Sequence, residues 1–189
     1  QQIHDLYDAS LFLTNTAGLN IDTSAGNLNI GYDLAKPLAL VKQGTNAITL
    51  AGSTNTYGGN TYLYGGTLRF DATTVTNSIG KLYAGYSATN GAAAIHEGGY
   101  LDCASSVNGA ETLAVGSAGT GSYGYYRMNG GTLKTGWLSV PGNNGYNAVY
   151  EQFAGDAYVV GSGSWLIMGW VNVNNSAAAI NLYGGRLYN

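Results

Sequence analysis

The stretch "NTYLYGGTLRFD", residues 60–71, recurs later in the chain as "YYRMNGGTLKTG" (125–136) and as "AINLYGGRLYN" (179–189). In each copy a leucine stands two residues after the second glycine. Two looser copies have Gly98 and Ala154 at the position of the first glycine. Measured between these first-glycine positions, the five copies are 33, 32, 24 and 30 residues apart. A period of 20–50 residues indicates a solenoid or a related repeat array.

Each copy alternates inward-type and outward-type residues. The third residue after the first glycine position is always apolar, the fifth is mostly apolar or small, and the fourth is polar or amphipathic. This period of two predicts a half-buried β-strand. The expected inward residues are Leu68, Leu101, Leu133, Ala157 and Leu187, followed by Phe70, Cys103, Thr135, Val159 and Asn189.

A second column of residues repeats with nearly the same period. It contains the leucines of "KLYAGY", "TLAVGS", "WLSVPG" and "WLIMGW", which are Leu82, Leu113, Leu138 and Leu166. An apolar residue follows two positions later, and then a turn residue: Gly85, Gly116, Pro141 or Gly169. Two columns with one period predict two or more strands per repeat.

Short strands of this kind cannot bury their apolar face alone, so we expect the repeats to stack about 4.8 Å apart with equivalent strands parallel. The predicted fold is an all-β parallel β-helix of five to seven coils, a β-solenoid. The glycine pairs are its expected corners, where the chain needs positive φ or lacks room for a side chain: Gly65, Gly66, Gly98, Gly99, Gly130, Gly131, Gly184 and Gly185. A propeller, the alternative, needs blades of about 40–45 residues.

Composition narrows the function classes. Only 9% of the residues are charged, yet 45% are hydrophobic, and 30 of the 189 are glycine, which favours an ordered all-β chain over a disordered one. The net charge of −3 argues against nucleic acid as a partner. No apolar run is long enough for a transmembrane helix, so we expect no membrane insertion of this segment.

Residues 39–70 resemble the passenger-associated repeat of bacterial autotransporters. The matching residues are Lys42, Gly44, Ile48, Leu50, Gly52, Asn55, Tyr57, Gly58, Gly59, Gly65, Gly66, Thr67 and Leu68. The resemblance implies a right-handed β-helix on the outside of a Gram-negative-type cell, secreted or associated with the outer membrane. It brings no catalytic residues, and no C-terminal translocator barrel follows in this sequence.

The alignment also predicts columns of charge on the outer surface. Arg69, Asp102 and Lys134 share one column, and Asp156 lies beside Arg186 in another. Such ladders pair opposite charges on neighbouring coils and contribute about 0.2–1 kcal/mol each. The alternative, an acidic and basic cleft of the kind that polysaccharide lyases use, needs several carboxylates in one column, and no column holds more than one.

Other candidate catalytic or metal sites are weak. Glu97, Glu151 and Asp156 could supply a glycosidase pair, but Glu97 is expected two coils from the other two, roughly 10 Å along the axis, which disfavours it. His4 and His96 lack a second ligand at metal-binding spacing, and Cys103 falls in an inward column. We therefore expect no enzyme activity, no cofactor and no metal.

Aromatic residues offer a more specific hypothesis. Trp137 and Trp165 share an outward column, with Trp170 nearby, and Tyr158 and Tyr188 share another. Stacked aromatic rings on the surface suit sugar rings or a protein partner, but they also stiffen a solenoid without any ligand. Both interpretations remain open from the sequence.

Residues 1–35 are less regular and are expected to form a cap or the first coils, and residues 36–189 to form the β-helix repeats. Because the chain stops partway through the repeating phrase, we expect it to continue in a longer protein. The predicted function is a structural or adhesive scaffold at the cell surface or in a fibre. Its expected partners are other copies of itself, end to end or side by side, or cell-surface glycans and proteins. The alternative function is a carbohydrate-binding or polysaccharide-degrading β-helix.

Overall fold

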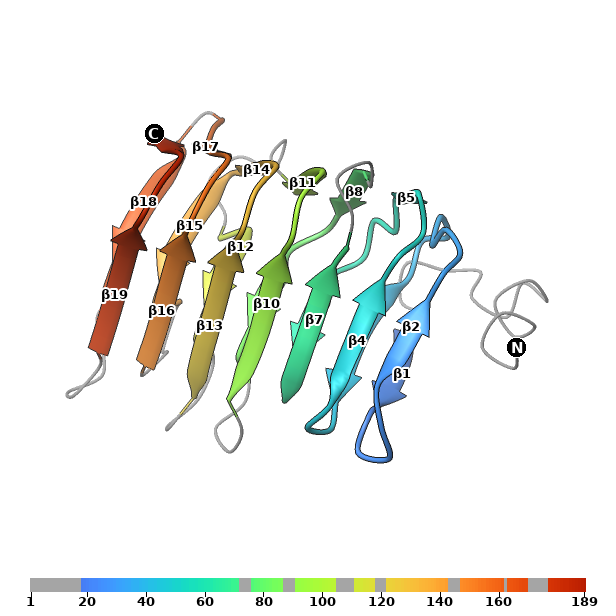
Figure 1. Ribbon diagram of the computed structural model, residues 1–189. Coiled ribbons are helices and arrows are strands. Elements are labelled where there is room, and N and C mark those ends of the chain that lie inside the picture. Colours follow the sequence, from blue (N-terminus) through green and yellow to red (C-terminus); the bar gives the residue numbers. More distant parts are fainter. Residues whose placement is uncertain are drawn as a thin grey trace.

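The computed structural model describes residues 18–71, 76–86, 91–104, 111–117, 122–142, 147–161, 163–169 and 177–189. Within these ranges the chain forms strands and turns and no helix, and the strands build three parallel sheets (Figure 1). The prediction of an all-β fold built from stacked parallel strands is confirmed at this level.

The first sheet has seven strands, in the spatial order β1 (Gly18–Asp22), β3 (Ala39–Gln43), β6 (Thr61–Leu63), β9 (Leu82–Ala84), β12 (Leu113–Val115), β15 (Trp137–Val140) and β18 (Trp165–Met168). The second also has seven: β2 (Leu28–Ile30), β4 (Ala47–Leu50), β7 (Gly66–Phe70), β10 (Ala92–His96), β13 (Tyr123–Met128), β16 (Asn147–Gln152) and β19 (Ala177–Leu182). The third has six: β5 (Thr54–Asn55), β8 (Thr76–Ile79), β11 (Tyr100–Cys103), β14 (Thr132–Thr135), β17 (Asp156–Val159) and β20 (Arg186–Tyr188).

The chain visits the sheets in the same order each time, and we call one such pass a coil. Strand order along every sheet follows chain order, so the colours of Figure 1 run from blue to red along the stack. The first two strands, β1 and β2, already pair in parallel with β3 and β4. Residues 18–30 therefore belong to the stack, while residues 1–17 of the expected cap lie outside the described part.

The core runs through the middle of the stack. Inward residues of the middle coils are fully buried, as the alternation predicts for Leu101, Leu133 and Ala157 in the third sheet and for Leu82, Leu113 and Leu138 in the first. Burial decreases in the last coil, where Met168 is 56% exposed and Leu166 and Leu187 are only partly buried.

The glycine pairs lie at corners, but not all at the same corner of the coil. The second glycine of each pair has positive φ: 65° at Gly66, 71° at Gly99, 80° at Gly131 and 78° at Gly185. Gly66 opens β7 of the second sheet, whereas each of the other three lies immediately before a strand of the third sheet. Both corners need the same left-handed residue before an inward leucine, so they look alike in the sequence.

This distinction corrects the predicted repeat. Leu68 pairs with Ile48 and Ala94 in the second sheet, not with Leu101. The true neighbour of Leu101 in the preceding coil is Asn77 of β8. The first coils are also shorter than predicted, since the register partners Leu19, Leu40, Thr61 and Leu82 are 21 residues apart.

Candidate functional site: the outer faces of the three sheets

Two tryptophans form an apolar face on the outside of the first sheet. Trp137 and Trp165 are register partners, as predicted, and their ring centroids lie 5.8 Å apart at an angle of 38°. Trp165 is 57% exposed, whereas the Trp137 indole N–H donates to the carbonyl of Gly163. The polar group of Trp137 is therefore already used within the chain. Trp170 lies outside the described residues.

The outer face of the third sheet carries a tyrosine pair and an ion pair. Tyr158 and Tyr188 stack at 4.7 Å with their rings 6° from parallel. Arg186 donates two hydrogen bonds, of 2.8 and 2.7 Å, to the carboxylate of Asp156, as the column alignment predicts. These bonds lower the pKa of Asp156 below its usual value. Whether either aromatic pair contacts a ligand stays a prediction.

The predicted charge column of Arg69, Asp102 and Lys134 is wrong at its first member. Asp102 and Lys134 are register partners in the third sheet, but the partner of Asp102 on the other side is Ser78. Arg69 lies in β7 of the second sheet, opposite Thr49 and Ile95. The error follows from aligning two different corners.

Arg69 instead begins a network on the outer face of the second sheet that the sequence did not predict. Its guanidinium pairs with Glu97, which also accepts a 2.6 Å hydrogen bond from the Asn129 amide. The Asn129 side-chain oxygen in turn accepts a 2.6 Å hydrogen bond from Arg127. The guanidinium of Arg127 lies 4.3 Å from the centroid of the Phe153 ring. Positive and negative groups thus alternate across neighbouring strands.

The three acids considered for catalysis do not come together. Glu97 follows β10 and Glu151 lies on β16, with β13 between them, and Asp156 lies in the third sheet. Each has its own partner: Arg69 for Glu97, Tyr125 for Glu151 and Arg186 for Asp156. Among the described residues no three His, Cys, Asp or Glu side chains gather as metal ligands.

His96 and Cys103 are core residues. Both are fully buried, and burial lowers the pKa of His96 to about 4, against weaker opposing contributions from the backbone of Gly98 and Gly99. The Tyr126 hydroxyl lies 3.4 Å from Nδ1 of His96. Burial raises the pKa of the Cys103 thiol, which makes it a poor nucleophile. His4 lies outside the described residues.

Lys42 is an unexpected core residue, because its position in β3 points inward and its side chain is fully buried. Its ammonium donates to the Thr23 hydroxyl at 2.8 Å and to three backbone carbonyls, those of Gln43 (2.8 Å), Gly44 (3.0 Å) and Gly65 (2.9 Å). Burial lowers its pKa to about 8, and Asp22 opposes this shift weakly. The motif resemblance includes Lys42 but does not indicate that it is buried.

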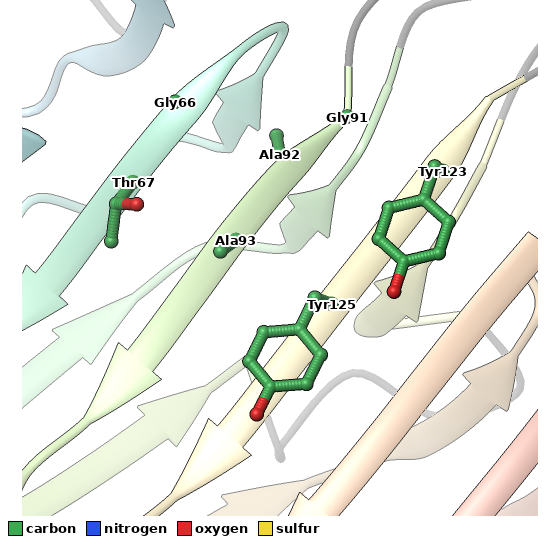
Figure 2. Close-up of a pocket in the computed structure, with 7 residues that line it drawn as sticks. All are labelled: Gly66, Thr67, Gly91, Ala92, Ala93, Tyr123 and Tyr125. Carbon is green, nitrogen blue, oxygen red and sulfur yellow. The ribbon is translucent and has the colours of Figure 1, made fainter. Parts of the chain in front are cut away.

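A depression of about 480 Å³ lies on the outer face of the second sheet. Figure 2 shows its lining: the rings of Tyr123 and Tyr125 follow one another along β13, beside small residues of β10 and β7. We call this depression the tyrosine recess; it is lined by Gly66, Thr67, Gly91, Ala92, Ala93, Tyr123 and Tyr125. Its sequence signal is "YGYY" at 123–126 aligned with "GAAA" at 91–94, which the apolar periodicity does not reveal.

Comparison with family models, curated proteins and solved structures gave no match. The resemblance to the autotransporter repeat therefore rests on the motif in residues 39–70 alone. No helix in the described ranges is long and apolar enough to cross a membrane.

Proposed function

We propose that this chain is part of a right-handed parallel β-helix that acts as an extracellular structural scaffold, at the cell surface or in a fibre. The observation that supports this proposal is the parallel ladder itself, which continues through seven strands in two sheets and six in the third. Each strand between the ends of a sheet pairs on both sides, so the stack has a built-in long axis. The motif in residues 39–70 favours the right hand and the extracellular location.

The outer faces suit a non-catalytic role. Charged groups on these faces form separate pairs, as in Arg69 with Glu97 and Arg186 with Asp156. Stacked side chains such as Tyr158 and Tyr188 extend along the stack and stiffen it. Lateral or end-to-end contact with other copies, or contact with surface glycans and proteins, would take place on such faces.

Negative-stain electron microscopy of the native protein, with the intact mass of its chain, tests the scaffold. The seven described coils span about 29 Å at 4.8 Å per coil. We expect rods or filaments longer than this, and a membrane-impermeant amine label applied to intact source cells should react with the protein. Short, dispersed particles of a single 189-residue chain, or a protein that the label does not reach in intact cells, would contradict the proposal.

A carbohydrate-binding role is the second candidate. It is favoured by the exposed rings of Trp165 and Tyr188, which offer flat apolar surfaces at the end of the described stack. Binding of tetrasaccharides to the purified chain, abolished by Trp165→Ala, would support this role for the tryptophan face.

A further inference from the structure

The tyrosine recess arises from a step in side-chain size between neighbouring strands. Tyr125 of β13 is the register partner of Ala93 of β10, and Ala93 is the partner of Thr67 of β7. On the outer face, therefore, a large ring stands level with two small outward side chains, those of Ala93 and Thr67, on the two neighbouring strands. The step is about two strands wide, or roughly 10 Å.

Backbone packing fixes which way the tyrosines point. Gly124 lies between them and faces inward, where a Cβ atom would come within 1.9 Å of the Gly116 nitrogen. Because side chains alternate along a strand, Tyr123 and Tyr125 both point outward. A Cβ atom on Gly91 would lie 3.2 Å from the Tyr123 ring, so the absence of a side chain at this position leaves room for the ring.

The two rings present apolar faces with hydroxyl groups attached. Tyr123 is 45% exposed, and the Tyr125 hydroxyl is held by a 2.5 Å hydrogen bond to Glu151. Figure 2 shows the two rings in line along β13, with both hydroxyls directed the same way. The Thr67 side chain adds a hydroxyl at the opposite side of the recess.

Charge excludes an ionic ligand as the preferred occupant. None of the seven lining residues is ionised at neutral pH. Two residues further along β7, Arg69 is already paired with Glu97, and the Glu151 carboxylate accepts a hydrogen bond from the Tyr125 hydroxyl. A neutral ligand with many hydroxyl groups fits these surroundings.

Backbone pairing excludes an added β-strand. The recess lies on a sheet face, and the backbone of β10 is already bonded to β7 on one side and β13 on the other. A peptide lying there would find no free ladder to extend.

We propose that the tyrosine recess binds a neutral oligosaccharide, with its C–H faces against Tyr123 and Tyr125 and its hydroxyls toward Thr67. Flat rings with polar groups at one end are suited to the two kinds of surface on a sugar. The scaffold function does not depend on this site, and the site differs from the Trp137 and Trp165 face.

The test is a titration of the purified chain with the neutral tetrasaccharides maltotetraose, cellotetraose, xylotetraose and N-acetylchitotetraose at millimolar concentration, read by saturation-transfer NMR and calorimetry. We expect at least one to bind. Tyr123→Ala should weaken its binding about five- to tenfold, the loss expected for one stacked ring. Ala93→Phe, which fills the recess, should abolish it.

Matched variants separate the possible outcomes. Ala179→Phe makes the same change in the same outward row, two strands beyond Tyr125 and outside the recess, and should leave binding intact. Far-ultraviolet circular dichroism and thermal melting check that each variant folds. The proposal is overturned if no tetrasaccharide binds, if Ala93→Phe binds normally, or if Trp165→Ala alone abolishes binding. It is also overturned if Ala93→Phe abolishes self-association, which would make a second copy the occupant. Filament formation, measured separately, reports on the scaffold function alone.

Discussion

The ammonium group of Lys42 and the carbonyl of Gly65 join two neighbouring coils through a buried 2.9 Å hydrogen bond. The same ammonium bonds Thr23 in the preceding coil, so one side chain connects three coils. It donates to the corner carbonyl groups of Gly44 and Gly65, and shares the Gln43 carbonyl with the Thr23 backbone N–H. A charged residue thus completes the polar interior of the corner.

Lys42→Met should therefore destabilise the chain. The substitution keeps a long apolar stem but removes the ammonium donor from the carbonyls of Gly44 and Gly65, and each buried carbonyl that loses its donor costs about 1–3 kcal/mol. We expect the free energy of unfolding in urea to fall by about 3 kcal/mol. Lys134→Met, on the outer face of β14, is the control and should change it by less than about 0.5 kcal/mol. Equal effects of the two substitutions would contradict the role of Lys42.

Lys42 should also make stability depend on pH on the alkaline side. Its pKa is about 8 in the folded chain, below the value of about 10.4 expected when unfolded. Between these values the unfolded chain binds more protons, so the free energy of unfolding should rise with pH. Denaturation of the wild type and Lys42→Met at pH 7 and pH 9.5 isolates this contribution. It is absent if the difference between the two proteins does not change with pH.

Corner glycines should be far less tolerant than their neighbours. Gly131 has a φ of 80°, and a Cβ atom there would lie 2.3 Å from the Gly99 carbonyl oxygen of the adjacent coil. Gly131→Ala should cost about 3 kcal/mol from strain and steric overlap. Gly130→Ala is the control, because a Cβ atom there would lie 3.5 Å from its nearest neighbour, the backbone carbonyl oxygen of Glu97. It should cost less than about 1 kcal/mol. Urea denaturation measures both, and a similar loss at the two positions would argue against this corner geometry.

Two features explain how far the sequence predicts this fold. The column of Leu82, Leu113 and Leu138 is found correctly because each leucine is followed by an apolar residue and then a turn residue. The column through Leu68 is not, because both kinds of corner require a glycine with positive φ before an inward leucine. The sequence predicts the local conformation of each corner, but the sheet to which a strand belongs depends on its neighbours in space.

Polar residues in the interior interrupt the apolar columns of the first coils, so the repeat there cannot be recognised from leucine spacing. Thr61 occupies the position that leucine takes at 40 and 82, and Asn77 takes the place of a leucine in the third sheet. Asn77 accepts a 2.9 Å hydrogen bond from Asn55, so a buried amide ladder replaces apolar packing there. The tyrosine recess cannot be predicted for a related reason: small residues on an outer face do not produce a regular spacing of apolar residues.

The corrected register predicts which charges interact. Arg69 pairs with Glu97, although the alignment of glycine pairs had placed it beside Asp102. A double-mutant cycle with Arg69→Gln and Glu97→Gln should give a coupling energy of about 0.2–1 kcal/mol. A cycle with Arg69→Gln and Asp102→Asn should give none. The reverse result would mean that β7 lies in the third sheet.

His96 should make the chain sensitive to acid. Burial lowers its pKa to about 4, whereas the unfolded chain protonates near pH 6.5, so the unfolded state binds more protons between these values. The free energy of unfolding should therefore fall as the pH drops from 6.5 to 4, by roughly 3 kcal/mol from this group.

His96→Phe separates this effect from other acid-sensitive groups such as the Asp156 carboxylate, which also has a lowered pKa. Phe70 occupies the same inward column in the adjacent strand, so we expect a phenylalanine ring to pack at position 96 as well. The variant loses the contact with the Tyr126 hydroxyl at every pH, which lowers stability by a constant amount. Urea denaturation at pH 7 and pH 4.5 should show a smaller acid loss in His96→Phe than in the wild type. If both proteins lose the same stability, His96 is either protonated in the folded chain or exposed to water, and the inward register of β10 at this residue is wrong.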